Sequence, residues 1–169
     1  MIVVRNIIYI VVFAAGALIG GVFPAYIAQY QQRLDAKYEQ VTDDLGPFQE
    51  IANRYHGGSM AALIDYHLAS TDRTFHDEGV AIRRMVLSEA QLADSRAAFD
   101  ASLFEKAAFL LLDPDIELAK ATWDSFTPAF VTTRDALVFA AAFGAFILVL
   151  FYLSLLLIRT KGRRLTKQA

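Results

Sequence analysis

The chain contains two long runs of apolar residues, one near each end, separated by a segment rich in polar and charged residues. No charged residue occurs from Asn6 to Gln32 or from Ala136 to Ile158. A helix rises about 1.5 Å per residue, so about 20 apolar residues cross the roughly 30 Å hydrocarbon layer of a bilayer. Both runs are long enough, and the pattern predicts transmembrane helices over residues 7–28 and 134–158.

The second run predicts the stronger insertion into a membrane. It holds fifteen Leu, Ile, Val or Phe residues between Leu137 and Ile158, which together favour insertion by about 5 to 9 kcal/mol. The first run holds eleven such residues, together with three glycines and a proline. A cleaved signal peptide is the alternative for this run, because Arg5 precedes it. The run is long for a signal peptide and lacks a convincing small-x-small cleavage site, so we expect a retained span.

Helices are also predicted throughout the segment between the two runs, residues 29–133. This segment shows neither sustained strand alternation nor an Asn-Gly hairpin signal. We expect the first span to continue as an amphipathic helix to Val41 and to break at Asp43-Asp44-Leu45-Gly46-Pro47. Further helices are then expected over residues 48–55, 60–69, 74–112 and 114–126. The predicted fold class is all-α: a two-span transmembrane helical hairpin with a helical extracytoplasmic domain.

The expected helix ends follow from residues that favour turns and caps. Gly57-Gly58 predicts a left-handed stop. Side chains that accept hydrogen bonds from the first backbone N–H groups are expected to cap the following helices; these are Ser59, Thr74, Asp113, and Thr132 or Thr133. The long helix over 74–112 is expected to bury one stripe of mostly small residues, from Ile82 and Val86 through Ala90, Ala93 and Ala97 to Leu111.

Charge is distributed unevenly along the 169 residues, although the formal net charge is only −2. All 18 acidic and ten of the 16 basic residues lie between Arg33 and Asp135, so that segment carries a net charge of −8. Five basic residues follow the second run within residues 159–169, and Arg5 precedes the first run in residues 1–6. Basic flanks stay in the cytoplasm. We therefore expect both termini to be cytoplasmic and residues 29–133 to lie outside the membrane, in the periplasm if the cell is Gram-negative.

Composition narrows the candidate chemistry. The chain is 56% hydrophobic and has no cysteine, which excludes disulfides, thiolate nucleophiles and cysteine metal sites. The acidic middle segment excludes a basic nucleic-acid-binding domain. The three histidines, His56, His67 and His76, lack the one-turn spacing of paired metal ligands. We expect no catalytic, cofactor-binding or metal-binding residues and no cofactor, and therefore not an enzyme.

Small residues recur four apart in both apolar runs. Gly16 and Gly20 share a helix face in the first run, as do Ala17 and Gly21; in the second run, Ala140 pairs with Gly144 and Ala141 with Ala145. Such faces allow close approach of helix backbones in lipid. We assign Gly16, Gly20, Gly21, Ala140 and Gly144 to helix–helix association. Two readings stay open, namely packing of the two spans on each other and contact with another subunit.

Polar residues at the ends of the spans suggest contacts with the bilayer surface. Gln29, Tyr30, Gln32 and Arg33 follow the first span, where they suit interfacial anchoring or a partner contact. After the second span, a basic tail is expected to contact anionic lipids; its residues are Arg159, Lys161, Arg163 and Arg164.

Four pieces of the sequence, in order, carry a resemblance to a known family. They are Phe23–Leu34, Ala61–Ser70 followed by Phe75, Asp113–Leu118 and Phe126–Ala129. With these pieces the chain resembles a proteobacterial inner-membrane family, the domain of unknown function numbered 2937. The resemblance covers nearly the whole chain. It implies a bacterial inner-membrane protein with two spans, and it implies no activity or catalytic residue.

These observations favour a non-enzymatic membrane protein that acts by association, as a homo-oligomeric scaffold or as an accessory subunit of a larger complex. The expected partners are membrane lipids and other membrane-protein subunits or further copies of the chain, with no nucleic acid. The alternative is a periplasmic sensory or ligand-binding module. Because only about eleven residues follow the second span, such a module would signal through a partner protein.

Overall fold

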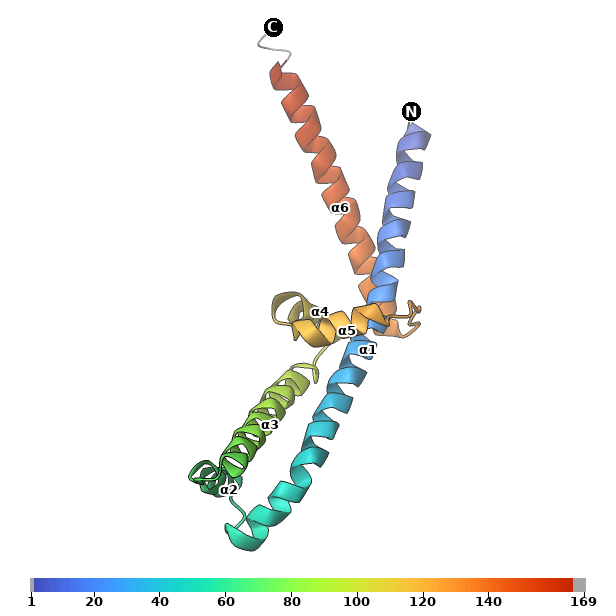
Figure 1. The fold of residues 1–169 in the computed structure, drawn as a ribbon. Helices are drawn as coiled ribbons and strands as arrows, with labels where there is room; N and C mark the ends of the chain where they lie inside the picture. The colour runs from blue at the N-terminus through green and yellow to red at the C-terminus, as the bar shows by residue number, and fades with distance from the viewer. Residues whose placement is uncertain (1, 166–169) are drawn as a thin grey trace. The chain divides into compact units, whose positions relative to one another are not determined.

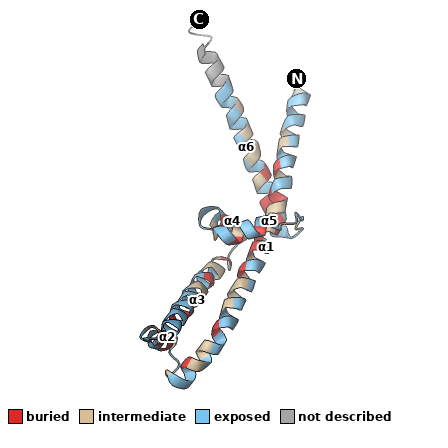
Figure 2. Cartoon of the chain, viewed as in Figure 1, coloured by how far each residue is buried: buried red, intermediate tan, exposed pale blue. Residues whose placement is uncertain are grey.

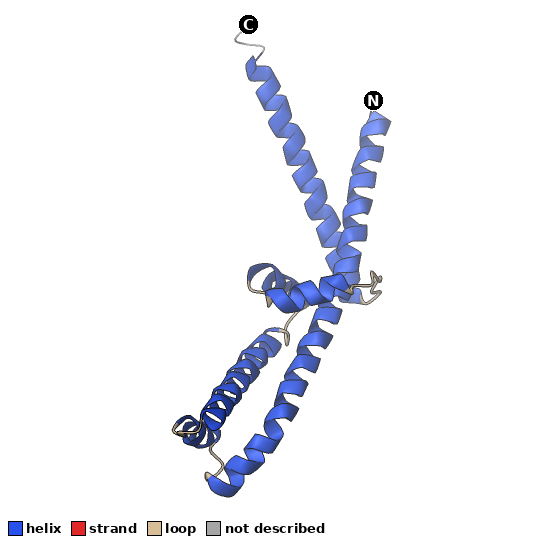
Figure 3. Cartoon of the chain, in the orientation of Figure 1, coloured by secondary structure: helices blue, strands red, loops and turns tan. Residues whose placement is uncertain are grey.

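Six helices make up the chain in the computed structural model, which describes residues 2–165 and the side chains of residues 3–158. The helices are α1 (Ile2–Tyr55), α2 (Met60–Leu68), α3 (Arg73–Ala98), α4 (Leu103–Leu112), α5 (Ile116–Asp124) and α6 (Arg134–Leu165). The described residues contain no strand (Figure 3). The predicted all-α class is confirmed, and α1 and α6 are both apolar and long enough to cross a membrane.

The helices form two compact units (Figure 1). The apolar unit comprises α1 up to Gln29, the stretch Leu103–Asp113 with α4, and the chain from Ala121 onward, including α6. The polar unit comprises Tyr30–Ser102, which includes α2 and α3, and the short stretch Pro114–Lys120. The units therefore do not follow chain order, because α4 groups with the apolar helices.

The polar unit has a small core built from α1, α2 and α3. Leu45, Ile64 and Ile82 form its buried centre, and partly buried apolar side chains surround them. Toward Tyr30, the Arg96 side chain donates to Asp35 Oδ1 at 2.6 Å and lies 4.4 Å from the centre of the Tyr38 ring. These contacts hold α3 along α1 at both ends of the unit.

The expected break at residues 43–47 is wrong, because α1 runs without interruption through Pro47 to Tyr55. A proline inside a helix removes a hydrogen bond and costs about 3 kcal/mol. Leu45 and Ala52, on either side of Pro47, are both buried, and Phe48 packs against the core. Burying a large apolar side chain such as that of Leu45 stabilises a protein by about 1.5–3 kcal/mol. Packing on both sides of Pro47 therefore offsets the cost of the proline.

The expected single helix over 74–112 is also wrong, since α3 ends at Ala98 and α4 begins at Leu103. Phe99 follows α3, is 2% exposed, and stacks on the Tyr30 ring with 5.3 Å between ring centres. The expected alanine stripe of α3 is exposed at Ala90, Ala93 and Ala97. The residue buried here is therefore Phe99, in the turn between α3 and α4, and not the three alanines of the expected stripe.

The helix caps confirm some predictions and shift others. Gly57 and Gly58 have φ of 61° and 82°, and the Ser59 side chain accepts from Ala62 N at 3.1 Å, as expected. The cap of α3 is Asp72, whose side chain accepts from Thr74 N at 2.8 Å. The predicted caps Thr74 and Asp113 are therefore wrong, and in the second case Asp115 caps α5 by accepting from Leu118 N at 3.0 Å. Thr133 Oγ1 accepts from Ala136 N at 3.4 Å at the start of α6.

Candidate functional site

Close glycine contacts join the first half of α1 to α6 in the apolar unit. A Cβ atom built on Gly16 would lie 3.0 Å from Ile147 Cβ and 3.1 Å from Gly144 Cα. A Cβ atom on Gly144 would lie only 2.9 Å from the carbonyl oxygen of Phe13. Such spacing requires glycine, because any larger residue would push the two backbones apart.

The aromatic contacts show that the two helices run antiparallel. Tyr9 meets Phe151 with 6.4 Å between ring centres, and Phe23 stacks on Phe139 at 5.9 Å. Residues later in α1 therefore meet residues earlier in α6. Between these two pairs, a Cβ on Gly20 would lie 2.7 Å from Phe143 Cβ.

The structure places the predicted small residues in three different environments. Gly16, Gly20 and Gly144 lie at the contact between α1 and α6, and Ala140 is 8% exposed. Gly21 instead faces the ring of Phe130, which lies in the loop before α6. The second small pair of α6, Ala141 and Ala145, remains exposed.

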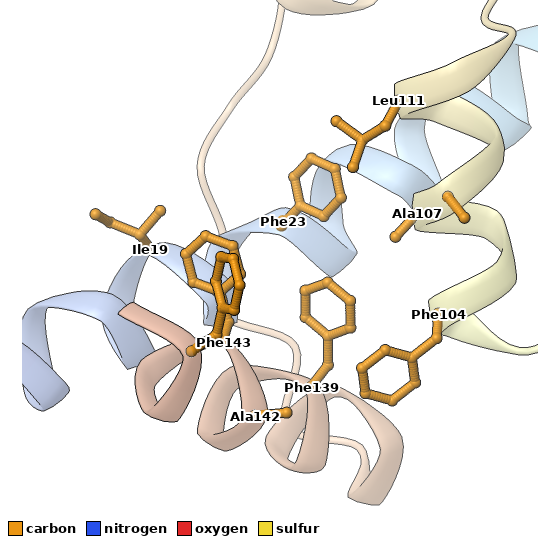
Figure 4. A pocket seen from close by; sticks show the side chains of 11 residues that line it. Ile19, Phe23, Phe104, Ala107, Leu111, Phe139, Ala142 and Phe143 are labelled. Atoms are coloured by element: carbon orange, nitrogen blue, oxygen red, sulfur yellow. The ribbon is translucent and has the colours of Figure 1, made fainter. Parts of the chain in front are cut away.

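An apolar pocket of about 500 Å³ lies beside this contact. It is lined from α1, α4 and α6 by Ile19, Gly20, Phe23, Phe104, Ala107, Ala108, Leu111, Phe139, Ala142, Phe143 and Phe146. Figure 4 shows Phe23, Phe104, Phe139 and Leu111 converging on the space between the three helices. No lining residue carries a polar side chain, so the pocket offers shape and apolar surface rather than reactive groups.

This pocket was not predicted from the sequence, although part of its signal is present there. In α4, with sequence LFEKAAFLLL, apolar residues occupy more than one face of a short helix. That pattern predicts burial on one side and an uncovered apolar surface on another. The approach of α4 to α1 and α6 depends on tertiary packing, which periodicity does not reveal.

The four polar residues predicted to contact the bilayer surface or a partner after the first span lie in different environments. Tyr30 is 0% exposed, and its hydroxyl accepts from Asp115 N at 3.2 Å. The Tyr30 ring is therefore enclosed within the polar unit. Gln29 donates to the Thr127 carbonyl at 3.2 Å in the apolar unit. Gln32 and Arg33 remain exposed.

Two of the three histidines have a polar contact with another residue of the polar unit. His67 Nδ1 lies 2.9 Å from the Leu63 carbonyl, and its Nε2 lies 3.5 Å from Glu78 Oε2. His76 Nδ1 lies 3.4 Å from Asp77 Oδ1. Among the described residues, no group of three or more His, Asp or Glu side chains is arranged to hold a metal ion. The side chains of the predicted lipid contacts Arg159, Lys161, Arg163 and Arg164 lie outside the described part of the chain.

Comparison with known families gives a match that covers nearly the whole chain. The sequence pattern of the family described as "Protein of unknown function (DUF2937)" matches residues 4–164. The chain belongs to this family. No curated protein and no solved structure matches it.

The first of the pieces that carry the resemblance to DUF2937 contacts the third and the fourth in the fold of this family member. In the polar unit, Tyr30 of the first piece contacts Asp115 of the third through the hydrogen bond described above. Lys37 adds an ion pair to the carboxylate of Asp115 at 3.5 Å. In the apolar unit, the Tyr26 ring meets Phe126 of the fourth piece with 5.5 Å between ring centres. These pieces therefore include contacts that define each unit, and they contain no reactive cluster.

Proposed function

We propose that this chain is a two-span bacterial inner-membrane protein that acts by association rather than by catalysis, as a homo-oligomeric scaffold or an accessory subunit. One observation carries the membrane placement. The most apolar windows of α1 and α6 are only 22% and 6% buried within the chain. A core helix of a soluble protein would be mostly buried, so these exposed apolar surfaces require lipid or another protein to cover them.

Exposure along α6 and aromatic residues near its beginning support the same placement. Figure 2 shows that α6 is largely exposed along its described length. Trp123 and Phe126 gather around Tyr26 just before α6, with Trp123 69% exposed. Trp and Tyr favour the boundary between hydrocarbon and water. We place this cluster at the outer surface of the inner membrane, with both chain ends in the cytoplasm, as the basic flanks favour.

Self-association has a specific candidate surface on α6. The contact with α1 occupies Gly144 and its neighbours, whereas Ala141 and Ala145 stay exposed one turn apart. Small residues at this spacing let a second helix approach closely in lipid. We propose that this second face contacts another subunit.

The test measures oligomeric state in detergent and in native membranes. We expect wild-type chain to form an oligomer or to retain a partner subunit, and Ala141→Leu to shift mass photometry toward the single chain. Ala15→Leu is the matched control, because Ala15 is also an exposed alanine, on the other span. A wild-type chain that is monomeric in detergent and shows no cross-linked neighbour in membranes would contradict the association role.

The alternative ligand-binding role has one candidate feature, a crevice of about 360 Å³ in the polar unit. Gln31, Asp35, Arg96 and Asp100 line it, together with Ala97 and Phe99. The guanidinium of Arg96 already pairs with Asp35 and covers the Tyr38 ring. Less of the Arg96 charge is therefore left for a ligand. We therefore favour association. Stabilisation of the polar unit by a metabolite or ion in a thermal-shift screen would instead support the ligand-binding role.

A further inference from the structure

Helix α4 carries apolar residues on two faces, one buried within the chain and the other largely exposed. Ala107 and Leu110 are buried. The second face, at Phe104, Ala108, Leu111 and Leu112, remains exposed; Phe104 is 49%, Leu111 75% and Leu112 84% exposed. Glu105 follows Phe104 at the edge of this face, whereas the helical spacing puts Lys106 on the opposite side of α4. A helix with this composition is suited to the boundary between lipid and water.

The direction of α4 agrees with such a position. Within the apolar unit, α4 runs across the direction of α1 and α6 (Figures 1 and 4). A helix that crosses two membrane-spanning helices near their outer ends would lie along the membrane surface. Phe104 also meets Phe139 of α6, with 5.0 Å between ring centres. This contact joins the exposed face of α4 to the apolar pocket.

We propose that this pocket holds one acyl chain of a phospholipid from the outer leaflet of the inner membrane. The proposal rests on the proposed membrane placement and adds a specific lipid site to it. Ile19 and Phe146, which line the pocket, are 64% and 56% exposed on the apolar helices. The lining is therefore continuous with the surface that lipid would cover, so a chain can enter sideways from the bilayer.

Size and polarity favour an acyl chain over other occupants. The volume of about 500 Å³ falls within the usual range for small-molecule sites, about 300–1,000 Å³. A helix about 10 Å across fills roughly 400 Å³ per turn, so a partner helix would fit by little more than one turn. Water is also unsuited, because the lining provides no polar side chains to bind it.

The test uses full-length chain in vesicles of phosphatidylethanolamine and phosphatidylglycerol that contain a phospholipid with a photoactivatable diazirine on its acyl chain. Mass spectrometry then locates the labelled residues. We expect several-fold more label on Phe23, Phe104 and Phe139 than on Val11 and Leu150, which are exposed on the spans away from the pocket.

Two substitutions fill the pocket from different helices. Ala108→Phe on α4 and Ala142→Phe on α6 replace exposed alanines of the lining, so neither disturbs a packed core. Each is expected to lower pocket labelling to the level of the exposed spans. Ala15→Phe, outside the pocket, is the matched control and should leave the labelling pattern unchanged.

The outcomes separate this proposal from the proposed membrane placement. Uniform labelling of all exposed apolar residues, unchanged by Ala108→Phe and Ala142→Phe, would overturn the lipid site while leaving the spans in the bilayer. Absence of label from both α1 and α6 would overturn the membrane placement as well. Labelling of the pocket that appears only when subunits separate would assign the pocket to a partner helix and overturn the lipid site.

Discussion

Substitution of Gly144 by alanine tests the contact between α1 and α6 most sharply. The added Cβ would lie 2.9 Å from the carbonyl oxygen of Phe13 and 3.1 Å from both N and Cβ of Ala17. Two of these three atoms belong to the α1 backbone. No change of side-chain rotamer relieves the overlap, so α1 and α6 must move apart along the contact.

The expected cost follows from two opposing terms. Forcing extra volume into a packed contact costs about 1–3 kcal/mol, and a rigid backbone neighbour favours the upper part of that range. Alanine recovers about 1 kcal/mol relative to glycine inside a helix. The net loss is therefore about 1–2 kcal/mol. A protein of this size loses about 2–4 °C of Tm per kcal/mol, so Gly144→Ala should lower Tm by about 2–8 °C.

Thermal unfolding in detergent, followed by circular dichroism, measures this change. The control is Gly46→Ala in the polar unit, where a Cβ would meet nothing within 4 Å. There only the helix-propensity gain of about 0.5–1 kcal/mol remains, so Tm should rise. If Gly144→Ala raised Tm as Gly46→Ala does, position 144 would be open and the α1–α6 contact would be refuted.

Three further predictions address other contacts. Because the chain has no cysteine, Gly16→Cys with Ile147→Cys should form a disulfide within one chain on mild oxidation; a ladder of disulfide-linked oligomers on a non-reducing gel would contradict the pairing. Ser59→Ala should cost about 1 kcal/mol through loss of the α2 cap, measured by urea unfolding, whereas an unchanged midpoint would refute the cap. Tyr30→Phe should cost about 0.5–1.5 kcal/mol by removing the hydroxyl that accepts from Asp115 N, and amide exchange at that N–H should accelerate; unchanged exchange would refute the bond.

The apolar helices were predictable because their signal is long and unbroken. Twenty or more residues without charge leave few alternatives to a helix that crosses a membrane or fills a core. Shorter signals were less reliable. Pro47 and its neighbours predict a break on local grounds, yet burial of Leu45 and Ala52 overrides that preference. Local sequence gives the cost of such a proline but not the packing that offsets it.

The helix caps and the pocket show a second limit. Asp72 and Asp115 cap helices where Thr74 and Asp113 were predicted, since several suitable residues lie within one turn and local spacing cannot choose among them. The small-residue pattern drew attention to Gly16, Gly20 and Gly144, which lie at the contact between α1 and α6, but it did not distinguish the face in contact from the exposed face at Ala141. The aromatic pocket arises from three helices far apart in sequence, and its members have no shared spacing.

The placement of the chain in the membrane can be measured directly by cysteine accessibility, because the natural chain contains no cysteine. One variant carries cysteine at Ala90, exposed on α3 in the polar unit, and a second carries it at Lys167 in the basic tail. A membrane-impermeant maleimide is applied to cells whose outer membrane alone is permeabilised. Our account predicts labelling at position 90 at once and at position 167 only after the inner membrane is opened. Immediate labelling at position 167, or protection at position 90, would contradict it.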